Sequence, residues 1–295
     1  MTQRVSRSLL AAAVVGAIAL TVPLAALGQT TVSAGASVRV LTGTFGGTET
    51  THVVLAPVVL RADVQRFELS VTVPFLKVDS GTVALSQAGF IPMQGSMSSA
   101  PSAGMPMGGG GMMGRPWTGG TAPGTITAVP FSASGPGDVV ASAGYRVVDH
   151  SFSGVQVVVG ARVKLPTADS TAGLGTGKTD VAGVVTLRKR YDGGWMYVEG
   201  GYLAVGKAAG ADLSNVALWS AGVGRHLAGR YYALASAAGS TAVVAAFGSP
   251  AEIGAGLGVK LGERLALTVL PSIGLSNASP KYGVTVGISS DLLRR

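Results

Sequence analysis

The stretch GVQVVVGARVKLPTADSTAGLGTGKTDVAGVVTL, residues 154–187, decides the fold of this chain. Its first half has one apolar and one polar face, because Val155, Val157, Val159, Ala161, Val163 and Leu165 alternate with Gln156, Gly160, Arg162 and Lys164. Side chains alternate across a β-strand with period two, so this pattern predicts a strand. Its length of about a dozen residues is unusual for a globular strand and suits a tilted strand crossing a bilayer. With the Gly- and Thr-rich loop that follows and a second strand from Val181, it predicts a hairpin of a membrane β-barrel.

Strand-like alternation recurs along the rest of the chain. The Ala-rich segments 213–227 and 230–238 also suit helices, but Gly222, Gly224 and the pair Tyr231-Tyr232 favour strands. The sequence therefore predicts an all-β fold, a transmembrane antiparallel up-and-down β-barrel of about twelve strands. The expected strands are 32–41, 51–62, 65–77, 138–149, 155–165, 181–191, 195–206, 213–227, 230–238, 252–261, 264–276 and 282–292.

The lengths of the links between these strands alternate. Links after even strands have two or three residues (63–64, 150–151, 192–194, 228–229, 262–263), whereas links after odd strands are longer (42–50, 78–137, 167–180, 207–212, 239–251, 277–281). Outer-membrane barrels have short periplasmic turns and long external loops. We therefore expect both ends of the barrel chain to lie in the periplasm.

The first 28 residues read as a cleaved signal peptide. Arg4 and Arg7 precede an apolar run, and Ala26-Leu27-Gly28 resembles a small-residue cleavage site. The alternative is a transmembrane helix over residues 9–28, but Pro23 and the small residues after it favour cleavage. We therefore expect a signal peptide at 1–28 and a barrel domain at 29–295, located in the bacterial outer membrane with lipid as its partner.

The composition excludes several classes of protein. Hydrophobic residues make up 47% of the chain and charged residues only 12%, whereas soluble proteins carry about 25% charged residues. The absence of cysteine excludes disulfides and thiolate-metal sites. The net charge is +8, but the basic residues are scattered singly, so we expect no nucleic-acid partner.

Residues 78–137 form a Gly-, Ser-, Pro- and Met-rich segment without periodicity, which predicts one long external loop. Such a loop is either a disordered surface segment or a gate that folds into the barrel. Its methionines offer thioether ligands for Cu(I), but neither His nor Cys accompanies them, so we predict no metal site.

The loop between the two strands of the opening stretch carries a family resemblance. Its sequence LPTADSTAGLGTGKTD, residues 165–180, resembles the outer-membrane barrel family named for the MetA pathway of phenol degradation. The resemblance implies a channel or transporter for small molecules, aromatic ones among them, and it supplies no catalytic residue. Ala168 departs from the Gly usual in that family, and the matching positions are Pro166, Thr167, Asp169, Gly175, Thr176, Gly177 and Asp180.

Two patterns suggest chemistry that we do not expect. Residues 172–179 nearly spell a phosphate-binding loop, but Ala172 replaces the required Gly and a β-pattern follows where a helix is needed, so we predict no nucleotide cofactor. The histidines are His52, His150 and His226, and none has the neighbours of a catalytic base in the sequence. We therefore predict that the protein is not an enzyme.

The polar face of the strands predicts which side chains line the lumen, since charge on the lipid face costs about 2–4 kcal/mol at mid-membrane. A net basic lumen would favour anions. Alternatively, the charges pair with one another and brace a narrow barrel. In either case the predicted function is passive passage of small solutes, aromatic or anionic compounds included, with a non-transporting structural or binding barrel as the alternative. The predicted lumen residues are Arg39, Glu68, Arg146, Arg162, Lys164, Arg188, Glu199, Arg225, Glu252 and Lys260.

Overall fold

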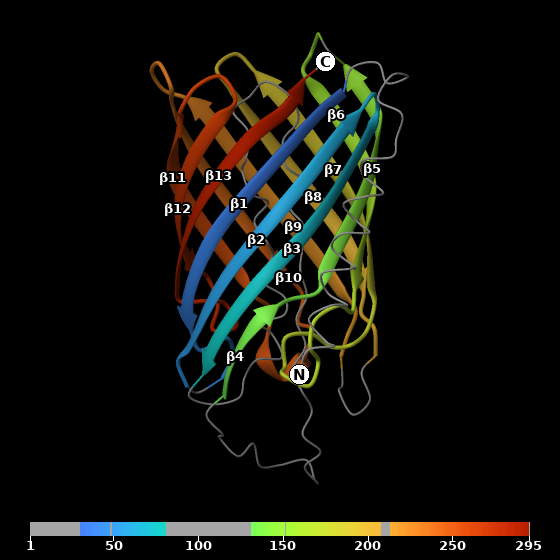
Figure 1. The fold of residues 1–295 in the computed structure, drawn as a ribbon, viewed down its shortest axis with the longest axis vertical. Helices are drawn as coiled ribbons and strands as arrows, with labels where there is room; N and C mark the ends of the chain where they lie inside the picture. Colours follow the sequence, from blue (N-terminus) through green and yellow to red (C-terminus); the bar gives the residue numbers. More distant parts are fainter. Residues whose placement is uncertain (1–29, 48, 81–130, 151, 208–212, 295) are drawn as a thin grey trace, which may run out of the picture.

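A computed structural model describes residues 30–47, 49–80, 131–150, 152–207 and 213–294, which form an antiparallel β-barrel (Figure 1). A short 3-10 helix, η3, spans Ala245–Phe247. Across the described residues, no helix is long and apolar enough to span a membrane. The strands are β1 (Thr30–Gly43), β2 (Thr51–Val64), β3 (Phe67–Ser80), β4 (Phe131–Pro136), β5 (Val139–His150), β6 (Val155–Leu165), β7 (Asp180–Tyr191), β8 (Gly194–Ala204), β9 (Val216–His226), β10 (Tyr231–Ser240), β11 (Ala251–Lys260), β12 (Leu265–Gly274) and β13 (Tyr282–Arg294).

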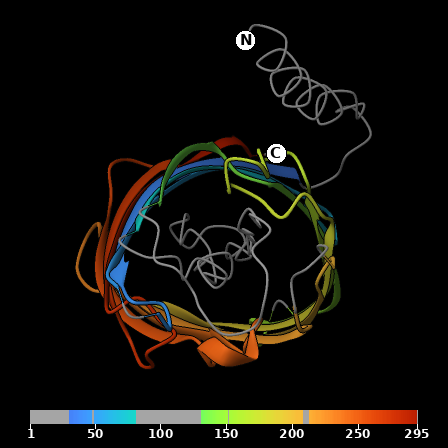
Figure 2. The ribbon, with the colours of Figure 1, turned by 90° about the horizontal axis from the view of Figure 1, so that it is seen from below.

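The sheet closes on itself, as the end-on view shows (Figure 2). Neighbouring strands pair antiparallel, and β1 pairs with β13 to complete the ring. β4 and β5 share one strand position, because β4 pairs with residues 75–80 of β3 and β5 pairs with residues 67–72. Gly137 and Asp138 separate these two halves. The ring therefore has twelve strand positions, which confirms the predicted closed barrel of twelve strands.

The long and short links lie at opposite ends of the barrel. The links 65–66, 192–193, 227–230 and 261–264 define what we call the short-turn end, at the top of Figure 1, together with the turn between β5 and β6. The opposite end is the long-loop end. The strands on both sides of the predicted loop 78–137 extend into it, since β3 continues to Ser80 and β4 begins at Phe131. Its residues 81–130, like the predicted signal peptide 1–28, lie outside the described residues.

The first hairpin turn also differs from the prediction. The turn lies at Gln65–Arg66 and not at residues 63–64, and Gln65 adopts a φ of 52° there. Asp63 is instead a buried residue of β2 that accepts hydrogen bonds from Arg61. Because the strand extends past the expected turn, Asp63 is part of the inward face of β2.

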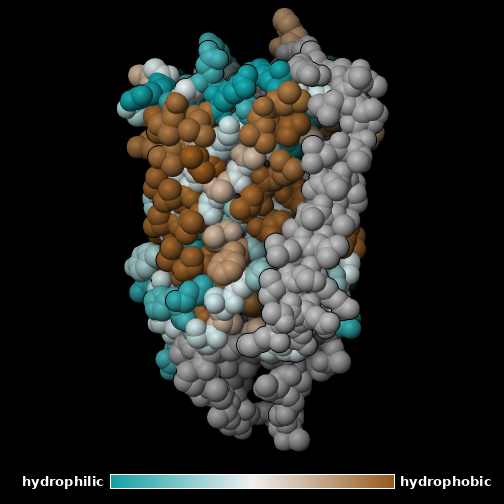
Figure 3. Space-filling model, in the orientation of Figure 1, coloured by the Kyte–Doolittle hydropathy of each residue, from teal (hydrophilic) through white to brown (hydrophobic). Residues whose placement is uncertain are grey.

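The outer surface of the barrel is apolar. Alternate residues of each strand point outward and stay exposed, among them Val38 (48% exposed), Val185 (51%) and Leu257 (60%). On the face drawn in Figure 3, apolar residues form a band that is framed by polar residues toward the two ends. A soluble protein buries such residues, so the band marks a surface that faces lipid. The fold is thus the predicted transmembrane β-barrel.

The exposed aromatic side chains lie at two levels on this band. Phe67 and Phe75 of β3 mark the levels, which are about 20 Å apart for a strand rise of 3.3 Å and the usual tilt. Outer-membrane barrels carry such girdles at both interfaces of an apolar band about 25 Å tall. The few aromatic residues of the chain therefore suffice for two girdles. Phe67, Tyr145, Tyr191 and Tyr231 lie at the short-turn end, and Phe75, Tyr202, Trp219 and Tyr282 lie at the long-loop end.

Gly256 of β11 lies where the neighbouring strand approaches too closely for a side chain. A Cβ atom there would lie 2.1 Å from the carbonyl oxygen of Val269 and 2.8 Å from the Cα atom of Leu270. Since both contacts are with backbone, no rotamer change relieves them. We expect Gly256→Ala to lower the free energy of unfolding by about 1–3 kcal/mol. Urea unfolding in lipid vesicles measures this, with Gly200→Ala as the matched control, because a Cβ atom at Gly200 has no neighbour within 4 Å. Equal effects of the two substitutions would contradict the steric explanation.

Candidate functional site: the barrel interior

Arg39 of β1 and Glu252 of β11 form an ion pair inside the barrel. The Nη2 atom of Arg39 lies 2.6 Å and 2.5 Å from the two carboxylate oxygens of Glu252. Both residues are buried, although two strands separate β1 from β11 in the sheet. Charge on the inward face of β1 is therefore neutralised by a residue of a distant strand.

Glu68 of β3 is the centre of a larger ion-pair network. Two nitrogens of the Arg188 guanidinium lie 2.7 Å and 2.9 Å from its two oxygens. Arg61 lies 3.1 Å and Arg146 lies 3.5 Å from the same carboxylate, and Arg61 also lies 2.8 Å from Asp63. Three guanidinium groups from β2, β5 and β7 thus surround one carboxylate. We call this group, with Asp63, the Glu68 network.

A β-bulge in β5 adds another carboxylate to this network. The register between β5 and β6 shifts between Arg146 and Val148, which places an extra residue in β5. A bulge of this kind redirects the side chains that follow it. Asp149 consequently accepts hydrogen bonds from Arg146 at 3.0 Å and from Gln156 of β6 at 3.0 Å. Without the bulge, three-residue spacing would put Arg146 and Asp149 on opposite faces.

A third pair joins β6 and β8. The Nη2 atom of Arg162 lies 2.6 Å from Oε1 of Glu199, and the Thr186 hydroxyl donates to Oε2 at 2.9 Å. All three residues are at least nine-tenths buried. The predicted lumen residues Arg162 and Glu199 are therefore partners.

Lys164 lies near the long-loop end between two carboxylates. Its Nζ atom lies 2.5 Å from Asp180 and 3.3 Å from Asp138, and it donates to the Thr176 hydroxyl at 2.8 Å. Asp138 also accepts the backbone N–H of Ala168 at 2.9 Å. These contacts tie the loop 166–179 to the barrel wall, and we call the three charged residues the Lys164 cluster.

The residues of the family-like motif shape the same loop. Thr167 accepts the N–H of Val139 at 2.9 Å, and Asp169 accepts the N–H and hydroxyl of Thr171 at 2.9 Å and 2.6 Å. Gly177 has a φ of 65°, which favours glycine. At Gly175 a Cβ atom would lie 2.8 Å from both oxygens of Asp138.

Other motif residues connect the loop to its surroundings. Asp180 accepts the N–H of Gly206 at 2.7 Å, and Pro166 is exposed just after β6. Leu174 is buried against Leu55 and Leu76 of the wall. The motif therefore has a structural explanation here, since its residues hold the loop against the interior of the barrel.

Two predicted lumen residues differ from the others. Lys260 is half-buried on the inward face of β11 and forms no ion pair with any residue that the structure describes. The prediction for Arg225 is wrong, because it shares the outward face of β9 with the exposed side chains Trp219 and Val223. Arg225 is exposed near the strand end, where charge on the lipid side costs little.

Sequence reasoning also missed three buried charged residues. Arg61 and Asp63 lie on the inward face of β2, and Asp138 lies at the break between β4 and β5. In β2 these two residues share the inward face with the apolar Val53 and Leu55, so polarity does not mark that face, and the turn expected at 63–64 placed Asp63 outside the strand. Nothing in the sequence pattern signals the contact of Asp138 with Lys164.

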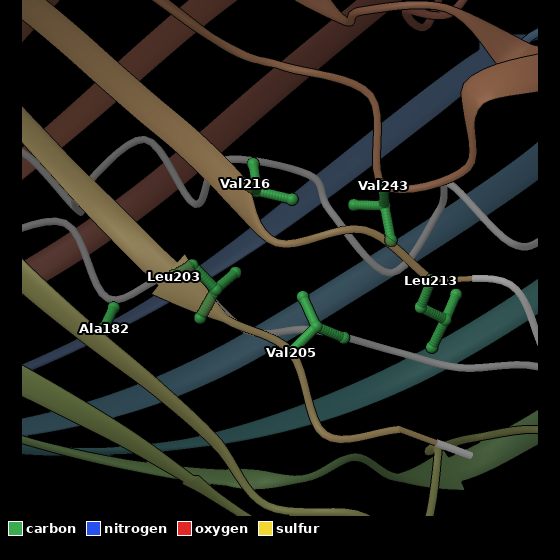
Figure 4. Close-up of a cluster of buried hydrophobic side chains, with 6 residues drawn as sticks. All are labelled: Ala182, Leu203, Val205, Leu213, Val216 and Val243. Atoms are coloured by element: carbon green, nitrogen blue, oxygen red, sulfur yellow. The ribbon is translucent and has the colours of Figure 1, made fainter.

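The interior carries apolar side chains as well as charges. Trp195, Tyr232, Leu234 and Leu270 of β8, β10 and β12 form one buried cluster, with Tyr197 packed against it. The Tyr232 hydroxyl lies 2.7 Å from the Thr268 hydroxyl. A second cluster joins β7, β8 and β9 to the links β8–β9 and β10–β11 (Figure 4), and it consists of Ala182, Leu203, Val205, Leu213, Val216 and Val243. One part of the interior wall is therefore aromatic and apolar.

The paired charges of the interior nearly balance in number. Six basic side chains take part in the interior ion pairs described above, and seven carboxylates face them. Of the two explanations that the sequence left open, this geometry supports bracing by ion pairs over a basic, anion-attracting lumen. The basic residues are Arg39, Arg61, Arg146, Arg162, Lys164 and Arg188, and the acidic ones are Asp63, Glu68, Asp138, Asp149, Asp180, Glu199 and Glu252.

The histidines are not assembled into a hydrolytic site in the described part of the chain. His52 Nδ1 lies 3.0 Å from the Thr42 hydroxyl at the long-loop end. Asp79, opposite His52 in the ladder, instead accepts a hydrogen bond from Ser132 and pairs with Lys77. In a catalytic triad, an imidazole activates the hydroxyl and a third group orients the imidazole, and Asp79 does not take that third place beside Thr42 and His52. The described residues also contain no group of three or more His, Cys, Asp or Glu side chains placed to hold a metal ion.

Comparison with known proteins yields structural likenesses only. No family model and no curated protein sequence matches the chain. Solved structures with a similar fold include the KdgM porin, with a TM-score of 0.49, 8% identity and coverage of 88% of this chain and 99% of that one. For the translocator domain of autotransporter NalP from Neisseria meningitidis, the TM-score is 0.43 and the identity is 12%, with coverage of 97% of this chain and 96% of that one. For the CymD monoaromatic hydrocarbon channel, the TM-score is 0.43 and the identity is 7%, with coverage of 90% of this chain and 89% of that one. With such low scores and identities, they assign neither a family nor a substrate to this chain.

Proposed function

We propose that the protein is a channel for the passive passage of small solutes across the bacterial outer membrane. The observation that carries the proposal is a lipid-facing barrel of twelve strand positions whose inward face is lined by charged, hydroxyl and aromatic side chains. Eight strands give a barrel that wall side chains just fill, and sixteen give an open porin. Twelve positions therefore leave a narrow path between the inward side chains.

The lining also bears on the kind of solute. Because the interior carboxylates neutralise the interior basic groups, the lumen lacks the excess positive charge that would select anions. The wall around Trp195, Tyr197 and Tyr232 is aromatic and apolar, and it carries none of the paired charges. We therefore propose that uncharged solutes with an apolar or aromatic part pass more readily than anions. The resemblance of residues 165–180 to the phenol-degradation barrel family agrees with this class of solute.

Planar bilayers test the channel directly. The purified barrel, inserted in a bilayer, should give reproducible unitary conductance steps. In a salt gradient, the ratio of anion to cation permeability should lie within about threefold of unity, because balanced charges focus no field of one sign. A folded but silent barrel would overturn the proposal in favour of a structural or binding role. Strong anion preference would leave a channel but contradict the balanced lumen.

A further inference from the structure

The outward face of β7–β10 carries a group of basic and aromatic residues at the short-turn end. In the strand ladders Tyr191 lies opposite Gly194, and Gly194 lies opposite Arg225. Gly194 has no side chain, and the Tyr191 ring covers it, with its hydroxyl donating to the Gly224 carbonyl at 3.2 Å. Tyr191 therefore leans over β8 toward the strand that carries Arg225.

The group extends to both sides of this contact. Lys189 lies two residues before Tyr191 and so shares its outward face. On the other side, the Arg230 guanidinium lies 5.6 Å from the centre of the Tyr231 ring. We call Lys189, Tyr191, Arg225, Arg230 and Tyr231 the basic–aromatic patch. All five side chains are exposed.

The basic residues of this patch have no acidic partners. Neither Lys189, Arg225 nor Arg230 forms an ion pair with another residue that the structure describes. The turns 192–193 and 227–230 contain a single carboxylate, that of Asp192. The arginines of the interior ion pairs, by contrast, each have a carboxylate within 4 Å. The patch therefore keeps positive charge at the edge of the lipid-facing band.

The turns beside the patch add apolar side chains. Leu227 is 57% exposed and Phe152, in the turn between β5 and β6, is fully exposed. An acidic soluble partner would match the cations but leave these side chains in water. The headgroup region of a bilayer accommodates both, because it joins charged phosphates to acyl chains, and Tyr side chains prefer that level.

We propose that the basic–aromatic patch binds the phosphate group of an anionic phospholipid in the membrane leaflet at the short-turn end. Arg225 and Arg230 present guanidinium forks that match phosphate oxygens, and Lys189 adds a point charge. Tyr191 and Tyr231 border the acyl chains below the headgroup. This proposal requires insertion in a membrane, but it does not depend on whether the barrel conducts.

Native mass spectrometry tests this binding on the purified barrel in detergent. Phosphatidylglycerol or phosphatidylcholine is added at equal concentration, and the bound lipid is counted. We expect phosphatidylglycerol to be retained preferentially, and the double variant Arg225→Gln/Arg230→Gln to lose that preference by about fivefold per removed charge, the scale of attraction between one basic residue and an anionic leaflet. Heat-dependent gel mobility checks that each variant is a folded barrel.

The matched control is Arg66→Gln/Arg264→Gln, which removes the same charge from exposed positions at the same end but outside the patch. It should change retention less than about twofold, because salt screens the attraction between exposed charges and a phosphate that they do not contact. The conservative variant Arg225→Lys/Arg230→Lys should retain most of the preference. Equal retention of the two lipids by the unmodified barrel, or equal losses in the patch and control variants, would overturn the proposal.

Discussion

Glu68→Gln is expected to lower the free energy of unfolding by about 3–5 kcal/mol, the usual cost of removing one partner of a buried ion pair. The carboxylate of Glu68 is buried and faces Arg61, Arg146 and Arg188. Arg188 is 2% exposed, and Glu68 is the carboxylate that binds both of its terminal nitrogens. After the substitution, Arg188 keeps a buried charge without its carboxylate. Urea unfolding in lipid vesicles, followed by tryptophan fluorescence, measures the loss.

Two further variants make this prediction specific. Glu263→Gln removes an exposed carboxylate from the turn between β11 and β12 and should change stability by less than about 0.5 kcal/mol. Arg188→Met in the Glu68→Gln background removes the stranded charge and should restore part of the loss, as a double-mutant cycle quantifies. If Glu68→Gln were as mild as Glu263→Gln, the network would not brace the barrel.

Lys164→Met is expected to destabilise the barrel by a similar amount, about 3–5 kcal/mol, and to loosen the loop 166–179. Lys164 is 3% exposed and is the cation between Asp138 and Asp180. Its removal leaves two buried carboxylates facing each other and deletes the hydrogen bond to Thr176 in the loop. Limited proteolysis should therefore cut this loop faster, in addition to the loss of stability in urea.

The loop itself offers the control for this second prediction. Lys178→Met alters an exposed lysine of the same loop and should leave stability, and cleavage by a protease that does not cut after lysine, close to those of the unmodified protein. Asp180→Asn added to Lys164→Met removes one of the two carboxylates, and its amide oxygen still accepts the N–H of Gly206, so stability should partly return. Unchanged proteolysis of the Lys164→Met variant would show that the cluster does not hold the loop.

The fold of this protein follows from local pattern. In β7 buried and exposed residues alternate strictly from Asp180 to Lys189, and the outward face of β6 is wholly apolar, so each residue's face is set by its position along the strand. The sorting of long and short links then predicts an up-and-down barrel, because neighbouring strands joined by two or three residues have to be antiparallel. Even the Ala-rich β9 and β10 are strands, as Gly222, Gly224 and the tyrosine pair indicated.

Weak alternation explains where the sequence misled. In β9, charge alone suggested that Arg225 points inward, whereas Trp219 and Val223 set the phase of the strand and place it outward. The bulge at Arg146/Val148 and the break at residues 137–138 cannot be recognised from periodicity. Each is a single local interruption, after which the alternation of side chains between the two faces resumes.

What only the tertiary structure decided is which charges meet. Residue positions predict that Arg39, Glu68, Arg188 and Glu252 face the interior, but the partners are 213 residues apart for Arg39 and Glu252 and 120 apart for Glu68 and Arg188. The contact of Arg39 with Glu252 depends on the closing pair of β1 with β13, and both contacts depend on the curvature and tilt of the sheet, which bring residues of non-neighbouring strands to one level. The sequence by itself therefore determined a lipid-facing barrel with a charged interior. Closure of that barrel determined that the interior charges neutralise one another, because burial leaves a carboxylate and a guanidinium no water and makes pairing their most stable state.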